Sequence, residues 1–441
     1  MARVAQSTTV IPMNTLIPGG AQTISKMRGR FPSAYPQSIV SANRGPLVAD
    51  ARGRVYLDWI CALGAISLGY HDEAVDQAVH DQVDAGPIFS LPNIELEERV
   101  AQRLVDLIPC AESVRFVKTG SEATEAAGRV ARAATGRELV VCCRGQYHGW
   151  HSWHAATRED CPGVPLAMTE LVRQFVYNDV ASLDKVIDDE RQGDTIAAII
   201  LEPTLIEPPA PGFLEGVRDR ATRIGALLIF DEMVTGFRWH AGGAQAYYGV
   251  TPDLACVGKG MGNGYPIAAL VGRADLMRHA MLVSSTFGGD CIGLAAADPT
   301  LARYQQGGVC EHMLEIGDRL MVGYNALAEQ IGAPTRMIGQ APHPVIRWDE
   351  VDSQDPHRQF LPEPNRHRAS LFFQETVTRG ILFHPEGINI MLAHSKADVD
   401  ETLEACRRAM IEVMTAIRDG TVLESIIGDP IDPRPVWRAT Q

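Results

Sequence analysis

The chain has 441 residues, 46% of them hydrophobic and 21% charged, a composition typical of a globular protein long enough for two domains. Its net charge of −14 argues against nucleic-acid binding, which needs clustered lysine and arginine, and the lack of apolar runs of about 18 residues argues against a membrane span. The nine cysteines are scattered, and the N-terminal MARVAQSTTVIPMN has no basic start followed by an apolar run, so we expect reduced thiols and a cytoplasmic protein.

From about residue 70, helical patterns alternate with short apolar runs. Helices are predicted over 95–107 and 122–135, and the apolar runs lie in SVRFVKTG, ELVVCCRG, RQFVYND, IAAIILEPT, ALLIFDEMV, LACVGKG and IAALVG. This alternation predicts βα units, and hence an α/β fold with a mostly parallel central sheet. Ligand sites in such sheets lie at the carboxyl ends of the strands.

The last part of the chain has a different pattern. Helices are predicted over 311–331 and 397–418, with strand-like pieces at HPVIRWDE and GILFHPEGINIMLAH. We therefore expect a smaller α+β domain over 311–441, to which the N-terminal segment 1–65 contributes, and a large domain over 66–310.

Two of the predicted strand ends carry an acid and an amine. Asp231 ends the run GALLIF, and Lys259 follows LACVG among four glycines, which leave room for a planar ligand. Burial would lower the pKa of this lysine and make it a nucleophile. Pyridoxal phosphate needs both groups, because a lysine forms the Schiff base and a carboxylate keeps the pyridinium nitrogen protonated. A structural ion pair is the alternative interpretation.

Two further stretches suit this cofactor. Gly120 and Ser121 begin a predicted helix whose free backbone amides favour a phosphate. Thr119 and Glu122 also fit an ordinary capping box, which is the alternative interpretation. Tyr147 and His148 follow another strand and could stack on a ring, or belong to an ordinary aromatic loop. Histidines spaced by three with intervening tryptophans match no usual zinc pattern, so no metal is predicted.

The residues resemble a known family, the class III aminotransferases of pyridoxal-phosphate fold type I, in the branch of glutamate-1-semialdehyde aminomutase. The likeness runs from LIPGG at residue 16 to about residue 405, and its most specific stretches are FDEMVTGFR, GVTPDLACVGKGMGNGYPIAALVG, GSEATEAAGRVARAATGR and YHGW. The resemblance implies Lys259 as the Schiff-base lysine and Asp231 as the pyridinium partner. The other cofactor-binding residues that it implies are Gly120, Ser121, Tyr147, His148, Glu202, Met233 and Thr286.

The resemblance also implies an assembly and a substrate site. Thr286 in SSTFGG matches a threonine that reaches the phosphate from the second subunit, which implies a homodimer with shared active sites. Lys26, Arg30 and Glu386 match positions near the substrate.

Departures from the aminomutase bear on the reaction. Leu63 stands where the aminomutase has a tryptophan, and Lys26 where it has its carboxylate-binding arginine, which a lysine does not replace. We therefore predict an aminotransferase that moves an amino group from an amino acid donor to a keto or aldehyde acceptor, in polysaccharide or specialised-metabolite biosynthesis. The alternatives are the 2,1-aminomutase reaction, a decarboxylase or epimerase, and a non-catalytic protein that binds pyridoxal phosphate.

Overall fold

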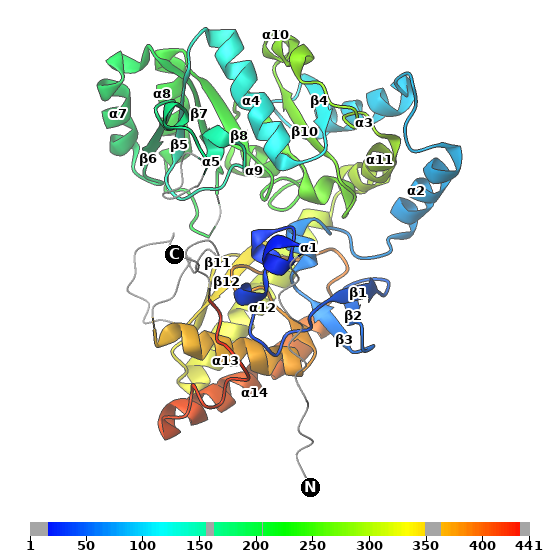
Figure 1. Cartoon of the computed structure of the whole chain (residues 1–441), viewed down its shortest axis with the longest axis vertical. Helices are drawn as coiled ribbons and strands as arrows, with labels where there is room; N and C mark the ends of the chain where they lie inside the picture. The colour runs from blue at the N-terminus through cyan, green and yellow to red at the C-terminus, as the bar shows by residue number, and fades with distance from the viewer. Residues whose placement is uncertain (1–15, 156–162, 205, 349–362, 433–441) are drawn as a thin grey trace.

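The computed structural model describes residues 16–155, 163–204, 206–348 and 363–432 (Figure 1). Residues 1–15, on which the expected lack of a secretion signal depends, lie outside the described part, as do the last residues of the expected 311–441 domain. Among the described residues, no helix is long and apolar enough to cross a membrane.

A seven-stranded sheet forms the centre of the larger part, in the order β4-β10-β9-β8-β7-β5-β6. Only β10 is antiparallel to its neighbours, so the predicted α/β fold with a mostly parallel sheet is confirmed. The strands are β4 (Ser113–Val117), β5 (Leu139–Cys143), β6 (Val172–Phe175), β7 (Ile196–Leu201), β8 (Leu227–Asp231), β9 (Leu254–Val257) and β10 (Ala268–Gly272).

Helices cover both faces of this sheet, which explains why its strands are apolar throughout. In β5, Val140 and Cys142 pack in the cluster that includes α4 (Gly120–Thr135). Val141 and Cys143 face the opposite cluster with α7 (Val180–Asp189) and α8 (Phe213–Ile224). The other helices of this part are α2 (Glu73–Ala85), α3 (Ile94–Leu107), α5 (Ser152–Ala155), α6 (Leu166–Thr169), α9 (Gly243–Tyr248), α10 (Ala274–Met277) and α11 (Cys291–Gln305).

The smaller part combines both ends of the described chain, as the blue and the orange-to-red segments show in the lower half of Figure 1. Its sheet has the order β1-β2-β3-β13, in which Ile381 pairs with Leu57. The strands are β1 (Ile39–Ala42), β2 (Leu47–Asp50), β3 (Val55–Asp58) and β13 (Ile381–Leu382), with α1 (Cys61–Gly64) following β3.

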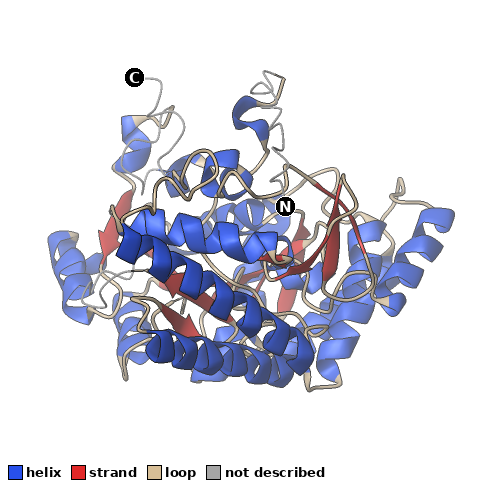
Figure 2. Ribbon diagram, turned by 90° about the horizontal axis from the view of Figure 1, so that it is seen from below, coloured by secondary structure: helices blue, strands red, loops and turns tan. Residues whose placement is uncertain are grey.

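Three long helices, α12 (Val309–Ile331), α13 (Asn365–Thr378) and α14 (Lys396–Asp419), pack together beside a hairpin of β11 (Arg336–Gln340) and β12 (His343–Arg347) (Figure 2). One buried apolar cluster runs from α2, α3 and α11 into these helices, so both parts share a core. The boundaries at residues 65 and 310 stay a prediction.

The stretch GILFHPEGINIMLAH differs from its predicted strand. Only Ile381 and Leu382 pair with a neighbour, in β13, and the chain then continues as a loop. Pro385 has no N–H to donate to a ladder, and Gly387 adds no side chain to pack on a sheet, so a longer strand is disfavoured. The loop instead brings His384, Glu386 and Asn389 to a cavity.

Candidate active site

Asp231 is held at the carboxyl end of β8 by its neighbours and is 3% exposed. One carboxylate oxygen lies 2.8 Å from Nδ1 of His148, and the other accepts the backbone N–H of Met233 at 3.1 Å. The carbonyl of His148 in turn accepts the hydroxyl of Thr124, on α4, at 2.7 Å. The structure thus brings together Asp231 and His148, which were predicted as separate site residues, and the imidazole orients the carboxylate.

Lys259 follows β9, the parallel neighbour of β8, after one glycine and begins a short helix, η5 (Lys259–Gly262). Burial lowers the pKa of its amine, the charges of Glu202 and Asp231 raise it, and the guanidinium of Arg238 lowers it. Because β7, β8 and β9 are parallel neighbours, Glu202, Asp231 and Lys259 stand at the same edge of the sheet. The expected placement of an acid and an amine at adjoining strand ends is thus what the structure has.

Glu202 completes this buried acidic pair from the end of β7. The backbone of Glu202 is fixed by the side chain of Gln146, through two hydrogen bonds of 2.9 Å, and its carboxylate accepts the N–H of Tyr147 at 3.2 Å. Burial, and then the charge of Asp231, raise the pKa of Glu202 to about 7. Glu202 is thus poised to change its protonation state near neutral pH.

Two glycines leave space around the side chain of Met233. A Cβ added to Gly120 would lie 2.9 Å from the sulfur of Met233, and one added to Gly258 would lie 2.8 Å from it. Any side chain at either position would displace this methionine. By contrast, Gly264, whose φ of +100° is left-handed, packs against Ile66. The glycines near Lys259 therefore serve close packing as well as space for a ligand.

The N-terminus of α4 lies beside the loop that follows β5. Thr119 and Glu122 form the predicted capping box, and the hydroxyl of Ser121 accepts the N–H of Trp150 at 3.3 Å. The N-terminal backbone N–H groups of this 16-residue helix therefore lie next to that loop, where they could bind an anion. Tyr147, in the same loop, is 56% exposed.

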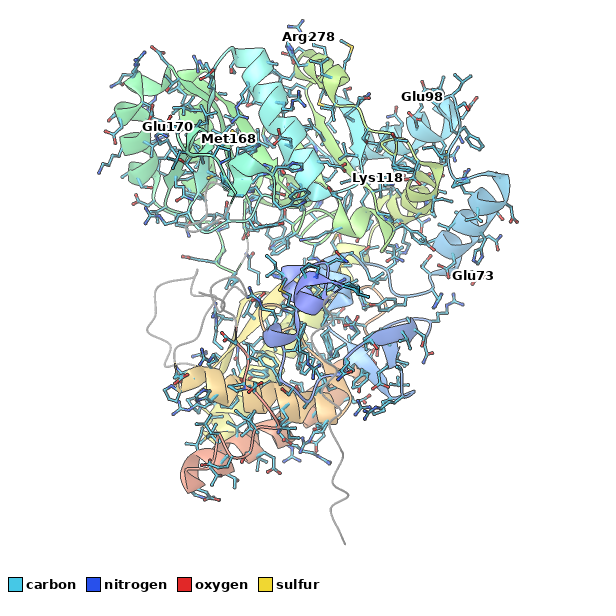
Figure 3. All side chains as sticks on the ribbon, viewed as in Figure 1. Glu73, Glu98, Lys118, Met168, Glu170 and Arg278 are labelled. Carbon is cyan, nitrogen blue, oxygen red and sulfur yellow. The ribbon has the colours of Figure 1, made fainter. Side chains whose placement is uncertain are left out.

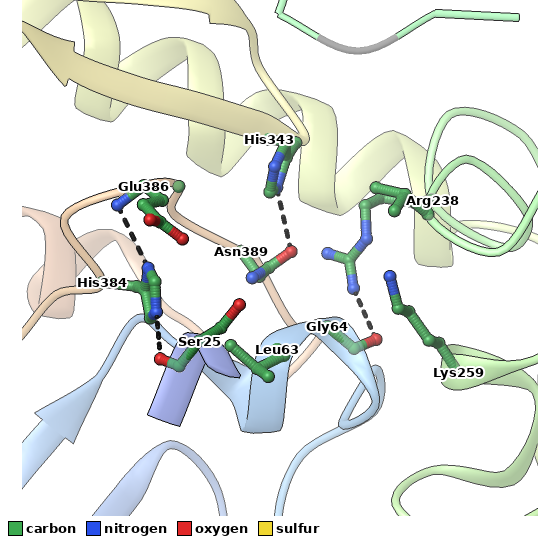
Figure 4. Close-up of a pocket in the computed structure, with 11 residues that line it drawn as sticks. Ser25, Leu63, Gly64, Arg238, Lys259, His343, His384, Glu386 and Asn389 are labelled. Carbon is green, nitrogen blue, oxygen red and sulfur yellow. Dashed lines mark hydrogen bonds between the residues drawn. The ribbon is translucent and has the colours of Figure 1, made fainter. Parts of the chain in front are cut away.

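Lys259 also lines a cavity of about 160 Å³ (Figure 4). It lies between the two parts of the molecule, because Arg238 and Lys259 come from the larger part and His343, His384 and Glu386 from the smaller. The guanidinium of Arg30 forms an ion pair with Glu386, so these two predicted substrate residues meet, and Glu386 lines the cavity.

Lys26 and Thr286 are exposed and are not among the residues that line this cavity. The side chain of Lys26 is exposed, whereas its neighbour Ser25 lines the wall and its carbonyl bonds His384 at 2.8 Å. Thr286 is exposed in the loop before α11. Their roles, and those of the other predicted site residues, stay predictions.

Sequence reasoning gave no role to Arg238, His343 and Asn389, all of which line the cavity. Arg238 stands within FDEMVTGFR, seven positions after Asp231, so its nearness to the site could have been suspected. His343 and Asn389 carry no such local signal, because they lie more than 80 residues from Lys259 in the chain.

Comparison with known proteins agrees with this geometry. The family model Aminotransferase class-III matches residues 32–410. A glutamate-1-semialdehyde 2,1-aminomutase of Syntrophobacter fumaroxidans is 36% identical, covering 90% of this chain and 95% of that protein. A 3-aminobutyryl-CoA aminotransferase of Cloacimonas acidaminovorans is 34% identical, covering 90% and 94%. The solved FumI protein of Sphingopyxis sp. MTA144, in its PLP internal aldimine form, has a TM-score of 0.83 at 29% identity, covering 91% and 95%. The chain belongs to the class III aminotransferase family, whose members are pyridoxal-phosphate enzymes of fold type I, as its resemblance predicted.

Proposed function

We propose that this protein is a pyridoxal-phosphate aminotransferase that transfers an amino group from an amino acid donor to a keto or aldehyde acceptor. The observation that carries the proposal is the position of Lys259. It stands at the same sheet edge as the buried carboxylates of Asp231 and Glu202, and it also lines a cavity. An amine placed there can exchange protons with a substrate that enters the cavity while a cofactor is held on the carboxylate side.

The residues present fit the cofactor. Asp231, oriented by His148, is placed to hold a protonated ring nitrogen, and the glycines at 120 and 258 leave a slot beside Met233. Tyr147 would cover a ring, and the amides at the start of α4, with Ser121, would hold a phosphate. When bound, pyridoxal phosphate supplies an electron sink for the carbon that loses a proton.

Lys259 is the group that moves the proton in this proposal. Burial favours its neutral amine, which can take a proton from the donor carbon and return it at another position. Glu202 supports the site by binding the backbone of the Tyr147 loop.

A homodimer is part of the proposal, because large apolar side chains are exposed near the start of α4. The set comprises Phe89, Leu91, Tyr147, Trp150 and Phe287. Lys118, labelled in Figure 3, forms an ion pair with Asp290 and so ties the end of β4 to the loop that carries Thr286. The backbone N–H of Cys291 donates to the carbonyl of Pro87 at 2.9 Å, which places the 87–91 segment against the same loop. A second copy that covers this surface would bring its own Thr286 loop to the phosphate site.

The first test is cofactor attachment. Protein supplied with pyridoxal phosphate is expected to be yellow, and borohydride should fix the cofactor onto Lys259. Lys259→Ala should lose both attachment and turnover, whereas Lys185→Ala, which removes an exposed lysine from α7, should keep them. A colourless protein that does not take up the cofactor would overturn the proposal.

A second test separates transfer from the aminomutase reaction, which the relative from Syntrophobacter fumaroxidans suggests. Transfer requires two substrates, so donor alone should convert the cofactor once and stop until a keto acid or aldehyde is added. Steady isomerisation of glutamate 1-semialdehyde without a second substrate would favour the mutase.

A further inference from the structure

We infer that Arg238 is a carboxylate-binding residue of the substrate cavity, so that the substrates are amino acids or keto acids rather than simple amines and aldehydes. This inference rests on the proposed function and specifies the substrate class of the same site.

Arg238 is a buried cation whose charge is not balanced by a carboxylate of the described residues. Its side chain is 2% exposed, yet it lines the cavity. One terminal nitrogen donates to the carbonyl of Ile390 at 2.8 Å and the other to the carbonyl of Gly64 at 3.0 Å. Both acceptors are neutral, and within the described ranges no carboxylate lies at ion-pair distance from this guanidinium. A buried charge is normally paired, so an anion is the expected complement.

The other cations near the cavity are already engaged or face elsewhere. Arg30 is paired with Glu386, which neutralises its charge in the absence of substrate. Lys26 is exposed and is not among the residues that line the wall. Lys259 is the amine that the reaction uses. Arg238 is therefore the cation that an entering carboxylate can bind without first breaking an existing ion pair.

The position of Arg238 relative to Lys259 fits a short substrate. Figure 4 shows both side chains on the same wall of the cavity, and the guanidinium is near enough to lower the pKa of the Lys259 amine. A carboxylate on Arg238 would thus lie close to the carbon that exchanges its amino group at Lys259.

The neighbouring histidine does not compete for the anion. The amide of Asn389 donates to the carbonyl of Ile60 at 3.1 Å, which turns its oxygen toward Nδ1 of His343, 3.0 Å away. Nδ1 must then carry the proton, and burial lowers the pKa of His343 to about 4. The imidazole is neutral at physiological pH, so the guanidinium provides the positive charge.

The experiment measures how acetate, a minimal carboxylate, binds to the holoenzyme. Acetate is added stepwise while the visible absorption band of the bound cofactor is recorded. Sodium chloride is replaced by sodium acetate, so that the ionic strength stays constant. Arg238→Gln is expected to weaken acetate binding by about tenfold or more, because it removes a charged hydrogen bond. Arg238→Lys should restore part of the affinity, since a lysine keeps the charge without the bidentate fork.

Arg28→Gln is the matched control. Arg28 also bonds two backbone carbonyls, of Tyr35 at 3.1 Å and Ser33 at 2.6 Å, but it does not line the cavity. Its loss should leave acetate affinity unchanged. If Arg238→Gln does not fold, Arg238→Lys alone decides, because an acetate affinity equal to that of the wild type would contradict bidentate binding.

The inference is overturned if the wild type does not respond to acetate, or if Arg30→Gln abolishes the response while Arg238→Gln retains it. In either case a yellow holoenzyme that borohydride still traps on Lys259 would leave the proposed function intact. Failure to bind the cofactor at all would instead refute the proposed function.

Discussion

The raised pKa of Glu202 predicts a specific dependence of stability on pH in the protein without cofactor. An unfolded glutamate titrates near 4.5, whereas the folded carboxyl titrates at about 7, because it is buried beside Asp231. Each pH unit of difference corresponds to about 1.4 kcal/mol, so ionising Glu202 in the folded state costs about 3 kcal/mol. The folded protein holds the proton more tightly, so stability is lost as the pH rises from 4.5 to 7.

Glu202→Gln should remove this loss, because the amide keeps an oxygen for the N–H of Tyr147 and never ionises. The variant should gain free energy of unfolding relative to the wild type as the pH rises from 4.5 to 8, approaching about 3 kcal/mol. Urea unfolding followed by circular dichroism at several pH values measures the difference. Glu207→Gln, at an exposed glutamate, is the control. A difference between Glu202→Gln and wild type that stays constant across this range would refute the reasoning.

Two substitutions test the walls of the site. Gly120→Ala would place a methyl group 2.9 Å from the sulfur of Met233, so we expect the dissociation constant of the cofactor to increase about tenfold. An unchanged dissociation constant, measured by absorbance, would contradict a cofactor slot at this position. Leu63→Trp replaces an aliphatic side chain that lines the cavity with a bulkier indole ring, so turnover of the bulkiest acceptor should fall about tenfold or more while the cofactor band stays intact. Equal losses for small and bulky acceptors would argue against a steric effect.

The central sheet and the chemistry at its edge could be predicted from local patterns. Apolar runs such as LACV mark buried strands, and a polar residue that ends such a run must lie at a sheet edge. Asp231 and Lys259 were found in this way, because parallel neighbours bring their carboxyl ends to one place. The capping box at Thr119 was equally local.

The pairing of the two chain ends could not be derived from these patterns. The strand-like piece over 380–394 was predicted too long, because periodicity does not show where a ladder loses its partner. The contact between Arg30 and Glu386 joins residues 356 positions apart. The resemblance placed both near the substrate, but only their packing shows that they neutralise each other.

The sequence by itself determined the strands, the acid and amine at their ends, and the family, because these depend on neighbouring residues and short motifs. The tertiary structure decided what surrounds the reacting amine. Segments around 25, 63, 238, 343 and 386 meet at one cavity only when the two parts of the molecule pack together. Whether a buried charge such as that of Arg238 is balanced depends on which distant groups this packing brings within a few ångströms.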